Sequence, residues 1–182
     1  ADGKRLQPRA IGNGEEANRL KSLLEGASYV VESVEAKPVK RNPSPPFTTS
    51  TLQQAASSKL GFSASRTMQV AQKLYEGTDI GGETVGLITY MRTDGVQMAP
   101  EAIDAARHAI GEQFGARYLP EKPRLYSTKA KNAQEAHEAI RPTDFNRTPD
   151  SVRRYLDDDQ LRLYDLVWKR GIASQMASAE IE

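Results

Sequence analysis

A proline-rich segment at residues 37–47 (KPVKRNPSPPF) constrains this chain more than any other feature. It holds four prolines in 11 residues. Proline has no N–H to donate and disfavours helix at the residue before it, so a long helix cannot run through this segment. We therefore predict a linker or a domain crossing here, with separate structure on its two sides.

The part before the prolines predicts one helix and one strand. Residues 15–26 carry leucines at helical spacing and end at Gly26, which suits the end of a helix. Residues 28–37 (SYVVESVEAK) are rich in β-branched and aromatic types and predict a strand. We assign residues 1–49 to a leading helix and part of a β-rich domain.

The part after the prolines predicts a helical domain at 50–176. Ser50 and Gln53 match a capping box, and Pro100 suits the first turn of a helix. Residues 177–182 read as the start of a strand. The predicted fold class is mainly α with a small β component, in which the helical domain is inserted between strands of a β-rich domain that is only partly present. Helices are expected at 51–61, 65–76, 100–114, 132–140, after Pro149 and at 157–176.

Composition narrows the class of protein without identifying a ligand. The chain has 25 Lys and Arg against 24 Asp and Glu, so net charge alone does not indicate nucleic acid. It has no cysteine, which excludes disulfides and thiolate metal sites and favours a cytoplasmic protein. No apolar run approaches the roughly 18 residues of a membrane span. The chain opens on Ala1 without a secretory signal, and we expect a segment of a longer protein.

The segment GLITYMRTDG at 86–95 could carry phosphoryl-transfer chemistry. In a strand, Ile88, Tyr90 and Arg92 would share one face. A phenol has a reference pKa of about 10, and a nearby cation favours its phenolate form. A guanidinium can also hold two phosphate oxygens. The structural alternative is a Tyr–Arg stacking pair on a sheet, and spacing alone favours that alternative.

The segment NAQEAHEAIRPTD at 132–144 offers a second polar cluster. On the predicted helix, Gln134, His137, Glu138 and Arg141 fall at i, i+3, i+4 and i+7 and share one face. Such a face could hold a phosphate or relay a proton. The alternative is a solvated helix face with a Glu138–Arg141 ion pair, and the spacing favours it.

Three other segments carry weaker signals. Residues 117–131 combine basic residues with two tyrosines, which suits single-stranded nucleic acid as well as it suits a solvated loop. The glycine-rich turn at 77–86 lacks the Gly-Lys-Ser/Thr ending of a phosphate-binding loop. Asp157–Asp159 stand where a helix begins, so we interpret them as a cap. No set of metal ligands is visible in the sequence.

Three segments together resemble a known family. Residues 45–77, 86–95 and 133–144, in this order, resemble the cleavage domain of the type IA DNA topoisomerases. The pattern QKLYE, then eleven residues, then ITYMRTD is similar to that family's signature. Met91 and the TDG ending resemble the bacterial topoisomerase I branch more than the topoisomerase III branch.

The resemblance implies roles for the candidate residues. Tyr90 would attack one DNA strand and form a 5′-phosphotyrosine, the other strand would pass, and religation without ATP would relax negative supercoils. Arg92 would position the phosphate, and His137 would assist it by hydrogen bonding. DNA contacts would come from Arg92, Gln134, Glu138 and Arg141.

The resemblance also implies partners and a cofactor. The partners would be a single-stranded DNA segment and the remaining domains of the same monomeric enzyme, on the nucleoid in the cytoplasm. Residues 1–49 and 177–182 would belong to an arch domain. Mg²⁺ would be held by an acidic cluster in a separate N-terminal domain that nothing here matches, so we expect this chain alone to be inactive. The alternatives are a non-catalytic single-stranded DNA-binding module and a helical bundle without a ligand.

Overall fold

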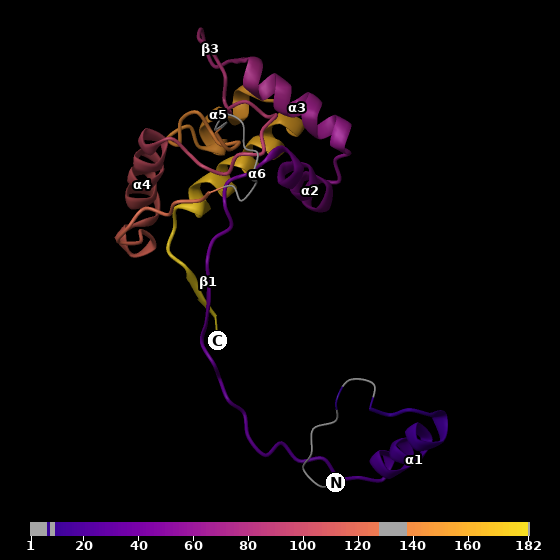
Figure 1. The fold of residues 1–182 in the computed structure, drawn as a ribbon. Coiled ribbons are helices and arrows are strands. Elements are labelled where there is room, and N and C mark those ends of the chain that lie inside the picture. Colours follow the sequence, from indigo (N-terminus) through magenta and orange to yellow (C-terminus); the bar gives the residue numbers. More distant parts are fainter. Residues whose placement is uncertain (1–6, 8–9, 128–137, 182) are drawn as a thin grey trace. The chain divides into compact units, whose positions relative to one another are not determined.

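The structure is a computed structural model that describes residues 7, 10–127 and 138–181. The chain divides into two compact units, Ala1–Lys37 and Pro38–Glu182, so the boundary falls at the first proline of the proline-rich segment (Figure 1). Among the described residues, no helix is long and apolar enough to cross a membrane.

The first unit contains the helix that the sequence predicts and lacks the strand. Helix α1 (Gly14–Glu25) begins at Asn13, whose side chain accepts the N–H of Glu16 at 2.8 Å. The predicted strand at 28–37 is wrong, because none of these residues is in a strand and the valines among them are exposed. A strand forms where a second strand takes its N–H and C=O groups, and no described strand pairs with this stretch.

The strand that does form lies inside the proline-rich segment. Strand β1 (Val39–Arg41) pairs antiparallel with β4 (Ala179–Ile181), so both ends of the second unit run side by side (Figure 1). Residues 39–42 contain no proline, which leaves their N–H groups free to pair. A strand therefore precedes the helices and another follows them. Their membership of an arch domain stays a prediction.

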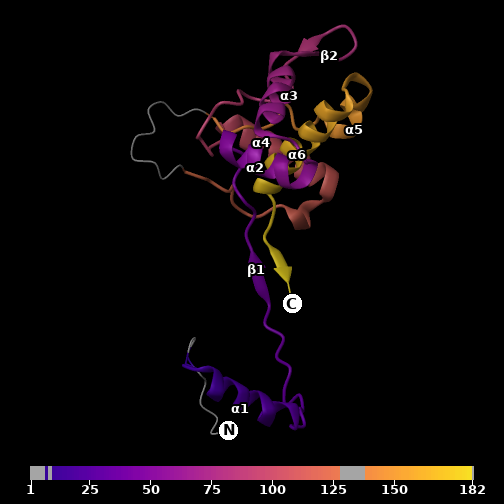
Figure 2. The same ribbon diagram turned by 90° about the vertical axis from the view of Figure 1, so that its right-hand side faces the viewer.

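The second unit packs its helices around α6 (Figure 2). Its buried side chains form one core that draws on every long helix of this unit, for example Leu52, Leu74, Ile110 and Val167. The predicted class, mainly α with a small β component, is confirmed. The helices are α2 (Thr49–Leu60), α3 (Ala64–Glu76), α4 (Pro100–Phe114), α5 (Pro149–Val152) and α6 (Asp158–Ser174), with 3₁₀ turns at Ala116–Tyr118 and Arg153–Tyr155.

Two helix starts show where local sequence rules succeed and fail. Asp157 caps α6 as predicted, since its carboxylate accepts the N–H of Gln160 at 2.8 Å and the Gln160 amide oxygen accepts the N–H of Asp157 at 3.0 Å. The predicted Ser50–Gln53 cap of α2 is wrong. Thr48 and Thr51 form the capping box instead, because the helix begins earlier in the sequence than predicted.

A short hairpin closes the glycine-rich turn between α3 and the candidate site. Strand β2 (Thr78–Asp79) pairs with β3 (Thr84–Val85), and Gly81 and Gly82 adopt positive φ angles of 97° and 107°. The Asp79 carboxylate accepts both glycine N–H groups at 2.9 Å, and these bonds lower the pKa of Asp79. The N–H groups of Gly81 and Gly82 are thus used within the protein.

Candidate active site

Tyr90 lies half-exposed on an extended segment between β3 and α4. From Tyr90 to Thr93 exposed and buried residues alternate, so Tyr90 and Arg92 are both open to solvent. The predicted face that also included Ile88 is wrong, because Ile88 is only 1% exposed. The strand expected across 86–93 is reduced to a single bridge from Ile88 to Pro142, and the chain bends at Met91 and Arg92.

The Tyr90 side chain lines a cavity of about 400 Å³. Three parts of the chain form this cavity: the end of α3, the segment 86–93 and the segment 138–143. Tyr75, from the last turn of α3, meets the Tyr90 ring edge to face with ring centroids 5.3 Å apart. Arg92 does not line the cavity. The phenol is therefore accessible, while its ring has an aromatic neighbour that limits its rotation.

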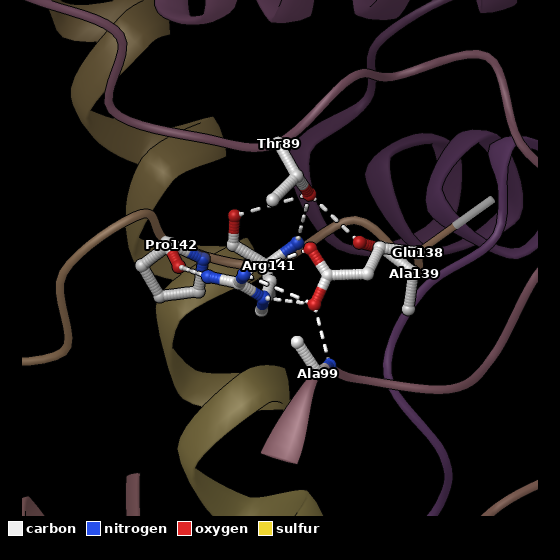
Figure 3. A network of polar contacts seen from close by, with 6 residues as sticks. All are labelled: Thr89, Ala99, Glu138, Ala139, Arg141 and Pro142. Carbon is white, nitrogen blue, oxygen red and sulfur yellow. Dashed lines mark hydrogen bonds and ion pairs between the residues drawn. The ribbon is translucent and has the colours of Figure 1, made fainter. Parts of the chain in front are cut away.

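Thr89 fixes the residue before Tyr90 to the segment 139–141 (Figure 3). Its backbone N–H donates to the Arg141 carbonyl at 2.9 Å, and its hydroxyl donates to the Ala139 carbonyl at 2.7 Å. In return, the Arg141 N–H donates to the Thr89 hydroxyl at 3.0 Å. These three bonds leave the Tyr90 backbone little freedom on its N-terminal side.

Thr49 fixes the residues after Tyr90 from the first turn of α2. Its hydroxyl donates to the Met91 carbonyl at 2.8 Å and accepts the Thr93 N–H at 2.8 Å. Its own N–H donates to the Thr93 carbonyl at 2.9 Å. N–H groups in the first turn of a helix lack helical partners, so α2 can use this one to hold the segment.

Gly86 allows the Tyr90 segment to approach the end of α3. A Cβ at this position would lie 2.6 Å from the Tyr75 carbonyl oxygen, which is closer than side chains tolerate. The approach lets the Leu87 N–H donate to the Leu74 carbonyl at 2.7 Å. On the other side, the Thr143 hydroxyl donates to the Gly86 carbonyl at 2.7 Å. The close approach brings Tyr75 and Tyr90 together.

The second predicted cluster is only partly described. Gln134 and His137 lie outside the described residues. The helix expected at 132–140 is wrong for residues 138–140, which are extended. The Ala139 N–H donates to the Gln97 carbonyl at 2.9 Å and the Ile140 N–H to the Phe47 carbonyl at 2.8 Å, both distant in sequence. The predicted helical face therefore does not exist for Glu138 and Arg141.

Glu138 and Arg141 form an ion pair beside the cavity (Figure 3). The shortest contact joins Arg141 Nη2 to Glu138 Oε2 at 2.8 Å. The Arg141 side chain is 13% exposed and the Glu138 side chain is 30% exposed. Glu138 Oε1 also accepts the Ala99 N–H at 2.6 Å, while Arg141 Nη1 donates to the Pro142 carbonyl at 2.9 Å. Both side chains are thus held by partners within the protein. Their DNA-binding role stays a prediction.

Sequence reasoning missed the residues that hold Tyr90 in place. Thr49 and Thr89 carry most of the hydrogen bonds, and Tyr75 supplies the aromatic contact. The only sequence signal for Tyr75 is its place in the QKLYE pattern. Nothing in the spacing of Thr49 connects it to a segment 44 positions away.

The described residues do not fit a magnesium site. Within 7, 10–127 and 138–181, no group of three or more His, Asp or Glu side chains could hold a metal ion. Glu138 is the one carboxylate among the described residues of the cavity wall, and it is paired with Arg141.

Comparisons with known proteins identify the family. Residues 2–182 match the family described as DNA topoisomerase. DNA topoisomerase 1 of Rickettsia bellii is 54% identical over 173 residues, which are 95% of this chain and 22% of that protein. DNA topoisomerase 1 of Zymomonas mobilis is 54% identical over 180 residues, which are 99% of this chain and 14% of that protein.

A solved structure agrees with these matches. Full-length topoisomerase I from Thermotoga maritima is 43% identical and superimposes with a TM-score of 0.73, over 90% of this chain and 26% of that chain. The chain thus spans about a quarter or less of the relatives it matches. By the match over nearly its whole length, and in agreement with the resemblance of its Tyr90 segment, the chain belongs to the type IA DNA topoisomerase family, in the branch of bacterial topoisomerase I.

Proposed function

We propose that this chain supplies the nucleophile of a DNA topoisomerase, with Tyr90 as the attacking residue. The observation that carries the proposal is the state of Tyr90, which is 44% exposed at a cavity while Thr89 and Met91 on either side are hydrogen-bonded to distant segments. A nucleophile must be open to its substrate and held in a fixed orientation.

The reaction exchanges one phosphorus–oxygen bond for another. The Tyr90 phenol oxygen attacks a phosphorus of one DNA strand, the bond to the 3′ oxygen breaks, and a 5′-phosphotyrosine remains. The phenol loses its proton and the 3′ oxygen ends as a hydroxyl. After the other strand has passed, that hydroxyl attacks the same phosphorus and releases Tyr90. The bond energy is conserved at each step, so negative supercoils relax without ATP.

Arg92 is the candidate for holding the reacting phosphate. It is exposed two residues from Tyr90, and its guanidinium makes no hydrogen bond or ion pair with another described residue. A free guanidinium can bind two phosphate oxygens and stabilise the charge that develops on them. The distance between Arg92 and a bound phosphate would be set by the bend at Met91 and Arg92.

The residues of the second cluster have two different proposed roles, namely direct contact with DNA and positioning of the site. For His137 and Gln134 we propose hydrogen bonds to the bound strand, supported by the position of the next described residue, Glu138, in the cavity wall. For Glu138 and Arg141, the internal ion pair favours a positioning role over the direct DNA contact that the family resemblance implies.

The whole enzyme supplies what this chain lacks. We propose that its partners are single-stranded DNA at the cleavage site and the remaining domains of the same monomeric enzyme, acting on the nucleoid in the cytoplasm. We propose that Mg²⁺ is held by an acidic cluster in a separate N-terminal domain, as the family resemblance implies; the described residues of this chain offer no ligand set for it. We expect no relaxation of supercoiled plasmid by this chain alone, and metal-dependent relaxation would contradict that expectation.

A chimeric enzyme tests the role of Tyr90. The chain replaces the matching segment of the Rickettsia bellii enzyme, which is 54% identical to it. After incubation with single-stranded oligonucleotide and denaturation, we expect a covalent protein–DNA adduct that Tyr90→Phe abolishes. Tyr75→Phe is the matched control, because it removes a phenolic hydroxyl beside Tyr90 and should keep the adduct. An adduct that survives in Tyr90→Phe would refute the assignment, and DNA binding without any adduct would favour the non-catalytic binding module.

A further inference from the structure

A groove of about 610 Å³ lies along one stripe of α6, beside the end of α2 and the segment 43–47. We call it the α6 groove. Four basic residues line it, namely Lys59 from α2 and Arg162, Lys169 and Arg170 from α6. Asp165 is the one acidic residue among the described residues of its wall, and it pairs with Lys169 at 2.7 Å. The groove therefore carries an excess of positive charge in a chain whose net charge is only +1.

Among these four cations, Arg170 gives the clearest indication that the groove binds an anion. Its guanidinium lies over the Phe47 ring, 4.4 Å from the centroid, and Nη1 donates to the Pro45 carbonyl at 3.4 Å. It makes no ion pair with any carboxylate of the described residues. Its guanidinium is partly buried, and this burial lowers the pKa of Arg170. A half-buried cation without a counter-ion gains from an anion that enters the groove.

Arg162 extends the positive wall and is held in place. Its Nη2 donates to the Leu60 carbonyl at 3.0 Å, at the end of α2, and its guanidinium lies 5.2 Å from the Phe62 ring centroid. Its Nη1 also lies 3.9 Å from the carboxylate of the exposed Asp158. Guanidinium has five N–H donors, so these contacts leave donors for a ligand. Lys59 and Lys169 are exposed and complete a row of cations along the groove.

The α6 groove is separate from the cavity at Tyr90. The two share no lining residue. Phe47 lies in the wall of the groove, and its backbone carbonyl accepts the Ile140 N–H from the segment that continues to the Tyr90 cavity. A ligand in the groove would therefore not occupy the place of a strand bound at Tyr90.

We propose that the α6 groove binds the phosphodiester backbone of DNA at a place distinct from the cleavage site. The inference rests on the proposed function in taking DNA as the polyanion that this chain meets. Phe47 is 1% exposed and offers no face on which a base could stack. The binding is therefore through phosphates, independent of sequence and strongly dependent on salt.

Paired charge-removal variants of the intact chain test this groove. The double variant Lys59→Gln/Lys169→Gln removes two exposed charges and leaves the core untouched. The matched control is Lys21→Gln/Lys37→Gln, two exposed lysines of the first unit, each in a surface ion pair as Lys169 is. Binding of an oligothymidylate of about 16 nucleotides is measured by fluorescence anisotropy over a range of salt concentrations.

The expected result is a smaller salt dependence for the groove variant alone. The slope of log K against log salt should fall by about 1.4, because each single-strand phosphate that a lysine no longer neutralises lowers it by about 0.7. The control should keep the slope of the unsubstituted chain. Equal slopes in the groove variant and the unsubstituted chain would overturn the proposal.

Lysine acylation followed by mass spectrometry separates this inference from the role of Tyr90. Bound oligothymidylate should protect Lys59 and Lys169 and leave Lys21 reactive, in the unsubstituted chain and in Tyr90→Phe alike. If Tyr90→Phe abolishes the covalent adduct in the chimera while Lys59 and Lys169 stay protected, both proposals are supported, each by its own measurement. If Lys59 and Lys169 stay reactive, or if polyglutamate protects them as well as DNA does, the groove does not select a phosphodiester backbone and the proposal fails.

Discussion

The hydroxyl of Thr49 accepts the backbone N–H of Thr93 at 2.8 Å, across 44 positions of sequence. The same hydroxyl donates to the carbonyl of Met91, the residue that follows Tyr90. Helix α2 therefore sets the backbone position of the candidate nucleophile, although it contributes no side chain to the cavity around it. The first residue of this helix therefore holds the candidate site as well as starting the helix.

Replacing Thr49 tests this link through stability. Thr49→Val keeps the shape of the side chain but leaves the Thr93 N–H and the Met91 carbonyl without their partner. Each unsatisfied buried group costs about 1–3 kcal/mol, so we expect a loss of that order in the free energy of unfolding, measured by urea denaturation. Thr49→Ser keeps the hydroxyl and should lose much less. Equal stability of the valine and serine variants would show that the hydroxyl is not needed.

Two glycine substitutions should change stability in opposite directions. Gly86→Ala places a Cβ 2.6 Å from the Tyr75 carbonyl oxygen, so the segment must move away from α3, at a cost of about 1–3 kcal/mol. Gly111→Ala lies within α4 with open space around its Cβ, and it should stabilise the helix by about 0.5–1 kcal/mol. Thermal unfolding of both variants gives the comparison. A Gly86→Ala variant as stable as the original chain would contradict the close approach.

The hairpin beside the site should respond to acid through Asp79. Its folded-state pKa is lowered from the ordinary value of 3.8 by hydrogen bonds from Gly82 and Gly81. The carboxylate therefore stabilises the hairpin above the unfolded pKa, and this contribution is lost as pH falls through the lower folded pKa. Carboxyl-carbon NMR should give a midpoint below 3.8 for Asp79. Asp79→Ala should remove the acid response from the Gly81 and Gly82 amide signals, whereas a midpoint at or above the ordinary value would contradict the two bonds.

Local sequence signals predict most of the helices because the residues that start and end a helix are its neighbours. Asp157 and Pro100 both stand where their chemistry suits the first turn. Strands are harder to predict, because a strand needs a partner that the local sequence does not show. The valines at 28–37 have strand propensity but no described partner, while β1 forms beside prolines because β4 is available to it.

The exposure of the candidate residues agrees with the sequence prediction, whereas the contacts that hold Tyr90 in place could not be predicted from the sequence. A short pattern singles out Tyr90 and Arg92, and both are exposed as that role requires. The polar residues between positions 134 and 141 recur at helical spacing and predict a helix, which the described residues 138–140 do not form. The backbone of 138–140 pairs instead with Phe47, Gln97 and Thr89, which lie far from it in sequence. Such pairings depend on the whole fold, so a local pattern cannot reveal them.

The ion pair between Glu138 and Arg141 gives the last prediction, which separates positioning from DNA contact. Glu138→Gln keeps the acceptor for the Ala99 N–H but removes the charge opposite Arg141, which is mostly buried. Breaking this pair should cost about 1–3 kcal/mol in the free energy of unfolding. Glu112→Gln breaks the exposed His108–Glu112 pair and should cost at most about 1 kcal/mol.

The same variants are then assayed for adduct formation in the chimeric enzyme. If Glu138 acts by positioning, Glu138→Gln should slow the formation of the Tyr90 adduct. The salt dependence of oligonucleotide binding should stay unchanged, because the same number of phosphates is neutralised. If Arg141 instead contacts DNA directly, Arg141→Gln should lower the salt slope by about 0.7, the amount for one phosphate on a single strand. A lower slope in Arg141→Gln would therefore reject the positioning role, because the internal ion pair uses the same guanidinium that a phosphate would need.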